Sequence, residues 1–268
     1  MVETQTQSEP VAIADQIVGE GTPLLILHGL FGSGRNWGGI ARTLAHEGRQ
    51  VHLLDARNHG GSPWGASMTY PEMAADVAAH IEKLGRGAVD VIGHSMGGKA
   101  SMTLALTRPD LVKRLVVVDI APVTYRGGAQ EPYGAYIDAM KSLDLGAIKR
   151  RAEADAQLAG AITDASMRAF LVQNLESGET GYHWRINLDG IAANLPALTS
   201  FPEIDAQYDG PMTVLAGELS NYVRPRDEAT IMKFFPQAKI VVVDGAGHWP
   251  HADQPERLLA LLREALAR

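Results

Sequence analysis

The sequence predicts an α/β fold in which a mostly parallel sheet carries helices on both faces. Three observations support this prediction. Short apolar runs recur along the chain without polar alternation, which is typical of strands buried on both faces of a parallel sheet. Stretches with helical periodicity separate these runs, as in sheets built by strand–helix alternation. Between residues 122 and 207 the alternation stops and helical patterns dominate, which predicts a helical insertion.

Six apolar runs are expected to form the parallel strands, at residues 24–27, 51–54, 89–92, 115–118, 212–215 and 240–243. An earlier run at 11–18 is expected to add an antiparallel edge strand or a hairpin. Helices are predicted where apolar residues fall on one stripe. One such stripe follows Pro71 and consists of Met73, Val77, Ile81 and Leu84. A second lies near the C-terminus and consists of Leu258, Leu262 and Leu266.

The insertion divides the predicted core into two parts. Residues 1–121 and 208–268 are expected to form the sheet with its helices, and residues 122–207 a helical cap. Helices are predicted in the cap at 132–143, 148–158 and 165–175, and no strong strand is expected there. Insertions after strand ends cover the crevice where α/β sheets bind ligands. The aromatic residues expected to line the substrate pocket, with ordinary packing as the alternative for each, are Tyr125, Tyr133, Tyr182 and Trp184 of the cap and Phe31 and Trp249 of the core.

Composition excludes several classes of protein. The 268 residues include no cysteine, which excludes disulfide scaffolds, thiolate metal sites and cysteine nucleophiles. The net charge is −7 without a basic stripe, so no nucleic-acid partner is expected. No apolar run approaches the ~20 residues of a membrane span. The polar N-terminus lacks the features of a secretory signal, and a cytoplasmic location is expected.

Residues 93–97 (GHSMG) provide the candidate nucleophile, Ser95. They match the G-x-S-x-G elbow and lie in its required context, between a predicted strand and a predicted helix. The elbow places a serine on a strained turn so that its hydroxyl projects from the sheet, and the flanking glycines let neighbouring backbone approach. The alternative is a chance match in a chain that contains 28 glycines.

Acyl transfer needs two N–H donors near the oxygen of the reacting carbonyl. Met96, the residue after the nucleophile, is expected to provide one of them at the start of a helix. The second is expected from the loop 28–32 (HGLFG), where Leu30 is the preferred donor and Phe31 the next.

A serine nucleophile also needs an imidazole to accept its proton. In this order of elements the base follows the last strand, so only His248 and His251 qualify. His248 is preferred because the glycine-rich loop 245–247 can carry it over the edge of the sheet. The other histidines considered are expected to hold loops by hydrogen bonds, as His28 and His94, or to lie on helix surfaces, as His46 and His80.

The imidazole needs a carboxylate on its other nitrogen. In most serine hydrolases with this order the acid follows the strand before the last one, but Ser220 stands at that place. Asp119 comes at the end of the predicted strand 115–118, which precedes that strand in the chain. It can reach the histidine from the same edge of the sheet, so it is the preferred acid. Glu218 and Asp227 are the alternatives. Asp55 precedes the nucleophile and is interpreted as a structural turn residue.

Together these residues resemble the α/β-hydrolase superfamily, and more narrowly the YbfF-type esterases and their animal mitochondrial relatives. The similar stretches are 28–37 (HGLFGSGRNW), 55–62 (DARNHGGS), 93–99 (GHSMGGK), 118–123 (VDIAPV), 170–175 (FLVQNL) and 245–249 (GAGHW). The resemblance implies the α/β-hydrolase fold and a serine esterase with a triad of Ser95, Asp119 and His248. It also implies that Ser220 assists the triad by a hydrogen bond, and that the substrates are short or medium acyl esters or acyl thioesters.

The predicted function is hydrolysis of a small-molecule carboxylic ester through an acyl-enzyme on Ser95, and the reaction needs no metal and no organic cofactor. Acyl thioesterase, perhydrolase and carbon–carbon hydrolase chemistry use the same residues and stay open. A haloalkane dehalogenase is excluded because it needs a carboxylate at position 95. The alternative from another class is a protein of this fold that binds a ligand without catalysis, although all three triad positions are filled.

Overall fold

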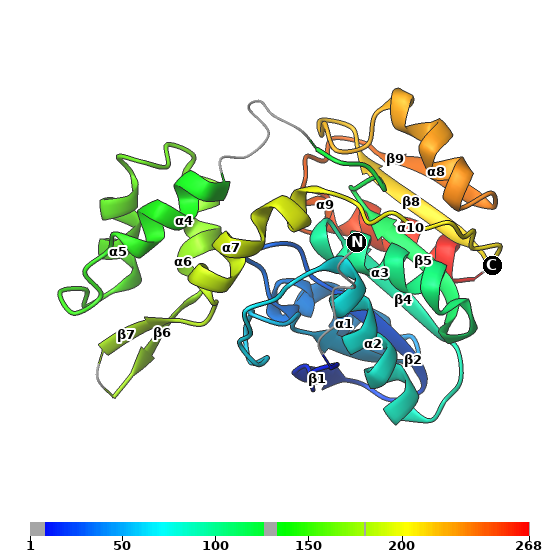
Figure 1. Ribbon diagram of the computed structural model, residues 1–268, viewed down its shortest axis with the longest axis horizontal. Coiled ribbons are helices and arrows are strands. Elements are labelled where there is room, and N and C mark those ends of the chain that lie inside the picture. The colour runs from blue at the N-terminus through cyan, green and yellow to red at the C-terminus, as the bar shows by residue number, and fades with distance from the viewer. Residues whose placement is uncertain (1–8, 126–132, 180, 268) are drawn as a thin grey trace, which may run out of the picture.

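The computed structural model describes residues 9–125, 133–179 and 181–267. Its main sheet has seven strands in the order β1-β3-β2-β4-β5-β8-β9 (Figure 1). β1 is antiparallel to β3 and the other neighbouring strands are parallel, which confirms the predicted sheet with its antiparallel edge strand. The strands are β1 (Asp15–Val18), β2 (Thr22–Leu27), β3 (Arg49–Leu54), β4 (Val89–His94), β5 (Val112–Val118), β8 (Met212–Gly217) and β9 (Ala238–Val243).

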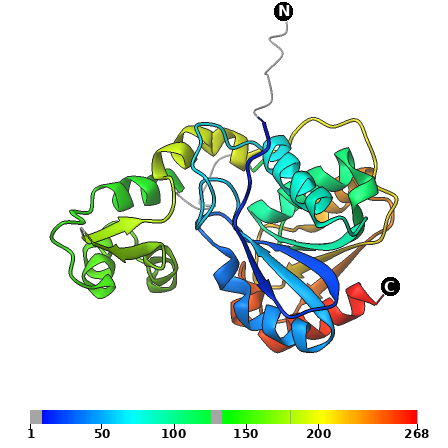
Figure 2. The same cartoon turned by 90° about the horizontal axis from the view of Figure 1, so that it is seen from below.

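Helices cover both faces of the sheet. Successive strand residues point to opposite sides, and because both sets are apolar, each face needs a layer of helices. In β2, Leu24 and Ile26 belong to the core that includes α1 and α10, whereas Leu25 and Leu27 belong to the core on the opposite face, which includes α2, α3 and α8. Figure 2 shows α1 and α10, in blue and red, below the sheet and α2 and α3 above it. The helices are α1 (Gly38–His46), α2 (Tyr70–Leu84), α3 (Met96–Thr107), α8 (Glu228–Phe234) and α10 (Pro255–Leu266), with the short helices η1 (Gly34–Trp37), η2 (Pro109–Leu111), η3 (Pro225–Asp227) and α9 (Pro250–Asp253) in the connections.

The ends of α2 show how local sequence fixes a helix. The Thr69 side chain accepts a hydrogen bond from the Glu72 N–H, and the Glu72 carboxylate accepts one from the Thr69 N–H. This reciprocal pair satisfies two N–H groups at the start of the helix. Gly85 follows the last turn with a φ of +63°, which favours glycine and ends the helix.

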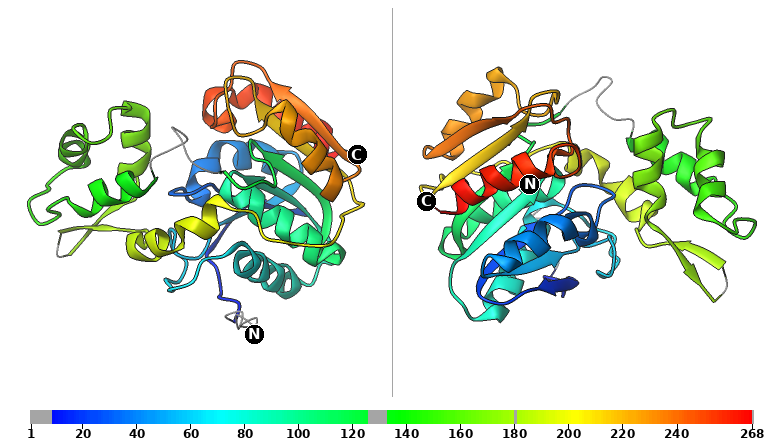
Figure 3. Two further views of the ribbon diagram at one scale, coloured as in Figure 1. Left: turned by 45° about the horizontal axis from the view of Figure 1, so that its top comes forward. Right: turned by 180° about the vertical axis from the view of Figure 1, so that it is seen from behind.

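Between β5 and β8 the chain forms a group of elements beside the sheet (Figure 3). The predicted helices are present but shorter than expected, and the predicted first residue of one, 132, lies outside the described residues. An antiparallel hairpin corrects the prediction that the cap contains no strand, since strands of four residues are too short to show a period of two. The cap limits at 122 and 207 remain predictions. The elements are α4 (Tyr133–Lys141), α5 (Arg151–Leu158), α6 (Ala165–Val172), β6 (Leu175–Gly178), β7 (Gly181–Trp184) and α7 (Leu188–Thr199).

The parallel strands bring their carboxyl ends to one edge of the sheet, where α/β folds bind ligands. Ser95 directly follows β4, Asp119 directly follows β5, and the loop after β9 carries His248. The predicted oxyanion loop follows β2. The topology therefore gathers the predicted site residues at a single edge.

Candidate active site

Ser95 lies on the turn between β4 and α3 with a φ of +51°. A non-glycine residue in this region is strained, so the surrounding backbone has to hold it there. Its N–H donates to the carbonyl oxygen of Val118 at 3.0 Å. A Cβ at Gly93 would lie 2.4 Å from the carbonyl oxygen of Gly97, and one at Gly97 would lie 2.5 Å from that of Leu27. Both glycines are therefore required for the elbow to form.

Three predicted residues form a continuous chain of hydrogen bonds. His248 Nε2 lies 3.0 Å from the hydroxyl oxygen of Ser95, and His248 Nδ1 lies 2.7 Å from Asp119 Oδ2. Asp119 is fully buried, whereas the Ser95 hydroxyl borders a cavity. These distances suit transfer of the serine proton to Nε2 while Nδ1–H donates to the carboxylate.

Asp119 is fixed by donors other than His248. The Gly217 N–H donates to Asp119 Oδ1 at 2.9 Å, and the Ser220 hydroxyl donates to Asp119 Oδ2. With the bond to His248, the buried carboxylate therefore accepts three hydrogen bonds, which fix its orientation. Ser220 thus contacts the acid in the way that the family resemblance implies.

The two alternative acids have other partners. Glu218 accepts a hydrogen bond from the Gly245 N–H at 2.7 Å, and Asp227 accepts one from the Arg224 N–H at 3.0 Å. Neither carboxylate contacts His248 within the described chain. The geometry therefore favours Asp119 as the acid.

The preferred oxyanion donors lie beside the nucleophile. Leu30 and Met96 line the same cavity as Ser95, and within residues 9–125 neither N–H donates to a protein acceptor. The Phe31 N–H instead donates to His59 Nε2 at 3.2 Å. The geometry therefore favours Leu30 over Phe31 as the second donor, because the Phe31 N–H already has a buried partner.

The cap holds the loop that carries these donors. Asn174 Nδ2 donates to the carbonyl oxygen of Phe31 at 2.8 Å, and Asn36 Nδ2 donates to Gln173 Oε1 at 3.1 Å. Both cap residues belong to the stretch 170–175 that carries part of the family resemblance. The cap thus contributes to the position of the oxyanion loop.

Buried neutral histidines hold the backbone around the site. His28 Nδ1 donates to the carbonyl oxygen of Gly29 at 2.7 Å, and its Nε2 accepts from the Ala56 N–H at 3.0 Å. His94 Nε2 donates to the carbonyl oxygen of His248 at 2.7 Å. Burial lowers the pKa of both His28 and His94, so their imidazoles stay neutral at pH 7. The two side chains hold loops, as predicted.

His251, the alternative base, stacks on Trp37 with ring centroids 4.5 Å apart. Burial and the neighbouring His248 lower the pKa of His251 to about 4. Its ring is not bonded to Ser95 in the part of the chain that the structure describes. The geometry therefore favours His248 as the base.

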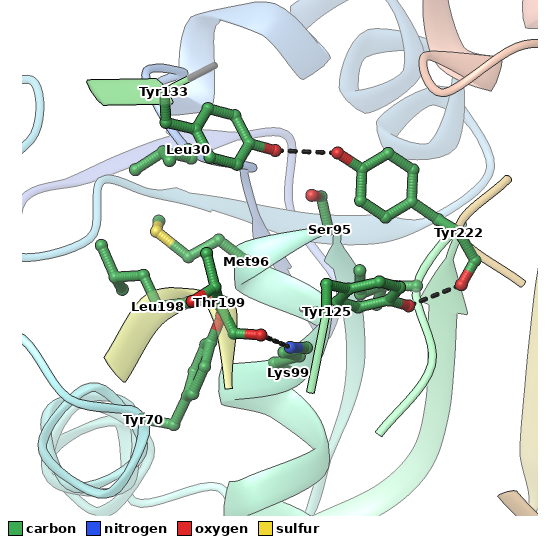
Figure 4. Close-up of a pocket in the computed structure, with 11 residues that line it drawn as sticks. Leu30, Tyr70, Ser95, Met96, Lys99, Tyr125, Tyr133, Leu198, Thr199 and Tyr222 are labelled. Atoms are coloured by element: carbon green, nitrogen blue, oxygen red, sulfur yellow. Dashed lines mark hydrogen bonds between the residues drawn. The ribbon is translucent and has the colours of Figure 1, made fainter. Parts of the chain in front are cut away.

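Two cavities meet at Ser95 and Tyr133, and Figure 4 shows the residues around the first of them. The predicted pocket residue Tyr125 lines the first cavity, Phe31 and Trp249 line the second, and Tyr133 borders both. The other two aromatic residues belong to the short hairpin of β6 and β7 (Figure 1), and neither of them lines either of these two cavities. These two residues are Tyr182 and Trp184.

Tyr222 is a site residue that the sequence did not reveal. Its ring stacks on that of His248, with centroids 3.9 Å apart and an angle of 25° between the planes. Its hydroxyl lies 2.9 Å from that of Tyr133, and its carbonyl oxygen accepts from the Tyr125 hydroxyl at 2.5 Å (Figure 4). Tyr222 therefore connects the candidate base to the cap; its position two residues after Ser220 is the only signal in the sequence.

Lys99 is a second residue whose role the sequence did not reveal, although it lies in the resembling stretch 93–99. Its side chain lines the first cavity but is 1% exposed. The amine donates to carbonyl oxygens at both ends of the cap, at 2.8 Å to Val123 and 2.5 Å to Ser200. It thus joins the cap to the helix that follows the nucleophile.

Comparison with known proteins assigns the chain to a family. Residues 22–255 match the family described as the alpha/beta hydrolase fold. This chain belongs to the α/β-hydrolase family. The predicted family and the predicted fold are both confirmed.

Relatives of this α/β-hydrolase are named as esterases and lipases. The sn-1-specific diacylglycerol lipase ABHD11 of Danio rerio is 44% identical over 242 residues, which cover 88% of this chain and 76% of the relative. Esterase YbfF of Escherichia coli (strain K12) is 34% identical over 245 residues, 91% and 93% of the two chains. Among solved structures, a marine microorganism esterase has a TM-score of 0.90 and 41% identity, and the match covers 95% of this chain and 99% of that one. As predicted, the chain is a carboxylic ester hydrolase.

Proposed function

We propose that this hydrolase cleaves esters with short to medium acyl chains through an acyl-enzyme on Ser95. The continuous chain of hydrogen bonds from Ser95 through His248 to Asp119 carries the proposal. A hydroxyl, an imidazole and a buried carboxylate joined in this order support the proposal, because acyl transfer needs a nucleophile, a base and an acid in that sequence. The two cavities that meet at Ser95 provide space for the two halves of an ester.

The reaction follows from the roles of these atoms. Ser95 Oγ attacks the carbonyl carbon while His248 Nε2 takes its proton, and the N–H groups of Leu30 and Met96 stabilise the oxyanion. His248 then gives the proton to the leaving alcohol, and the C–O bond breaks to leave Ser95 acylated. Water, deprotonated by His248, attacks the acyl carbon. His248 then returns the proton to Ser95 Oγ as the bond between Oγ and the acyl carbon breaks, and the carboxylic acid is released. Asp119 keeps the imidazole in the tautomer with Nδ1 protonated.

The two cavities divide the substrate between them. His248 must protonate the leaving group, and it lines the second cavity together with Trp249 and Phe170. The alcohol half therefore occupies the second cavity. The acyl half occupies the first cavity, where Leu198 and Ile120 provide apolar walls.

An acyl thioester is the second candidate substrate class, since a thiol leaving group needs the same nucleophile and less assistance from a general acid. The relative from Danio rerio is named for action on a diacylglycerol, so a glycerol ester is a further substrate to compare. Peracid formation would use the same acyl-enzyme with hydrogen peroxide in place of water.

Hydrolysis of a matched ester and thioester series tests the proposed function. We expect kcat/KM to be highest for esters of short to medium acyl chains, and Ser95→Ala to show only the uncatalysed rate. A higher kcat/KM for every thioester than for its matched ester would assign the chain to thioester hydrolysis instead. A diacylglycerol in the same assay, and hydrogen peroxide as a competing acyl acceptor, distinguish the remaining alternatives.

Labelling with a fluorophosphonate probe separates an enzyme from a protein that only binds ligands. We expect one adduct on Ser95 in the wild type and none in Ser95→Ala. A folded wild-type protein without an adduct would contradict the proposed mechanism.

The division of the substrate between the cavities predicts separable changes in specificity. We expect Leu198→Phe to shift the preference toward shorter acyl chains, because the larger ring fills the first cavity. Trp249→Ala should instead widen the range of accepted alcohols with little change in acyl preference. One acyl series with a constant alcohol and one alcohol series with a constant acyl group measure both effects. The assignment fails if Trp249→Ala alters the acyl preference and Leu198→Phe the alcohol preference.

A cytoplasmic location stays a prediction of the sequence. In the described ranges of the chain, no helix combines the length and the apolar character that a membrane span needs.

A further inference from the structure

Three side chains that offer metal-ligand atoms meet at the edge of the sheet far from the triad. Asp15 begins β1, His52 lies in β3 and His80 lies in α2, and β1 and α2 are neighbours in Figure 1. One ligand atom from each residue lies within 4.8 Å of the other two. His80 was predicted to lie on a helix surface, but its side chain is only 13% exposed because β1 covers it. The sequence did not indicate the cluster, since its members are 28 or more positions apart.

Hydrogen bonding within the cluster leaves two buried atoms without partners. Asp15 Oδ2 accepts from His52 Nδ1 at 2.7 Å, but His80 Nε2 lies 3.4 Å from the same oxygen and forms no hydrogen bond. Asp15 Oδ1 and His80 Nε2 therefore remain buried and unsatisfied among the described residues. Buried polar atoms without a partner are few in folded proteins, and a bound ion between Asp15 and His80 would account for two of them at one place.

The surroundings prepare the three groups for a cation. When an ion binds, it takes the place of the proton on His52 Nδ1, and the proton then carried by Nε2 donates to Gln50 Oε1, which lies 3.3 Å away. A carboxylate and two imidazoles thus face one point.

We propose that Asp15, His52 and His80 bind a Zn²⁺ ion, with water as the fourth ligand. Two imidazoles and one carboxylate are a common ligand set for zinc. Ligand atoms on one tetrahedral zinc lie roughly 3.3 Å apart, given Zn–N distances of about 2.0–2.1 Å. The Asp15–His80 distance of 3.4 Å already matches this value, and the Asp15–His52 distance of 2.7 Å has to open slightly.

The proposed ion is structural and takes no part in ester hydrolysis. β1 has four residues and lies at the edge of the sheet, separated from β4 and its nucleophile by β3 and β2. An ion held by β1, β3 and α2 joins this short strand to the core by bonds that the unfolded chain does not form. It therefore stabilises the fold by linkage and leaves the triad unchanged.

Metal titration of the untagged, EDTA-treated protein tests the site. We expect one Zn²⁺ per chain in equilibrium dialysis, and a rise in Tm of about 5 to 10 °C at a free zinc concentration 100 times Kd. Co²⁺, which occupies tetrahedral zinc sites, should give the intense visible absorption of a tetrahedral complex. The kcat of the metal-free protein below its Tm should equal that of the loaded protein.

Variants assign the binding to this cluster. His80→Gln and Asp15→Asn should lose the cobalt spectrum and the zinc-dependent rise in Tm. His46→Gln, which changes an exposed histidine on α1, should retain both. Because His80 is at the rim of the cluster, His80→Gln is expected to fold, and circular dichroism checks this. Absence of saturable binding in the wild type, or unchanged binding in both cluster variants, would overturn the proposal.

Discussion

Replacing Asp119 with asparagine should lower kcat/KM for an ester substrate by about 10⁴-fold, whereas we expect Glu218→Gln to change it little. The asparagine keeps the size of the side chain, and Gly217 N–H and the Ser220 hydroxyl still face it. Its amide can turn an NH₂ group toward His248 Nδ1, which favours the tautomer with the proton on Nε2. An imidazole in that tautomer cannot accept the proton of Ser95 at Nε2. The neutral amide of asparagine also lacks the negative charge with which a carboxylate stabilises the imidazolium.

The comparison with Glu218→Gln decides which carboxylate is the acid. Both substitutions remove one negative charge near the end of the sheet, but only Asp119 contacts His248. Thermal unfolding of both variants shows whether the fold is retained, so that a loss of activity reports on catalysis. Ser220→Ala should lie between the two, because it removes one donor from Asp119 Oδ2 and leaves the carboxylate in place. If Glu218→Gln has the larger loss in kcat/KM, Asp119 is not the acid.

The sequence could predict those parts of the site that depend on neighbouring residues or on the order of the strands. The elbow at 93–97 needs only a strand, a helix and two glycines that are neighbours in the chain. Asp119 and His248 follow from the strand order, since the carboxyl ends of parallel strands share one edge. The same logic predicted the seven-stranded sheet, because strands buried on both faces leave continuous apolar runs.

The parts that the sequence could not predict depend on contacts between distant residues. The Tyr133–Tyr222 hydrogen bond spans 89 positions, and no local pattern distinguishes these tyrosines from Tyr182. The Phe31 N–H looked available until the fold placed His59 against it. The hairpin of the cap escaped prediction because four-residue strands carry too few residues for a period to show.

The second prediction with a large expected effect concerns Lys99, because its amine forms hydrogen bonds to both ends of the cap. Its Nζ donates to Val123, which leads into the cap, and to Thr199 and Ser200, which lead out of it. Tyr125 and Tyr70 place their rings 4.7 Å and 5.5 Å from the amine. Ser95 precedes α3, and Lys99 lies four residues later in that helix. The amine therefore links the cap to the helix that begins at the nucleophile.

Lys99→Met should lower kcat/KM by about 10²-fold and the free energy of unfolding at pH 8 by about 3 kcal/mol. Methionine fills much of the same space but leaves the part-buried carbonyl oxygens of Val123 and Ser200 without this donor, whereas that of Thr199 still accepts from the Tyr125 N–H. The cap then loses its fixed position over Ser95. Lys113→Met, which changes an exposed lysine on β5, is the matched control and should have little effect on either quantity. Steady-state kinetics and chemical denaturation measure both effects.

The pH dependence of this stability difference distinguishes a buried amine from a simple packing residue. Burial lowers the pKa of Lys99 from 10.5 to about 7. Between these two values the unfolded chain binds more protons than the folded protein, so wild-type stability gains a contribution that rises with pH. Lys99→Met lacks this contribution, and the gap between the two proteins should be smallest at pH 7 and below and should widen toward pH 10. The widening is at most about 1.4 kcal/mol per pH unit. A constant gap across this range would mean that Lys99 acts through the size of its side chain alone.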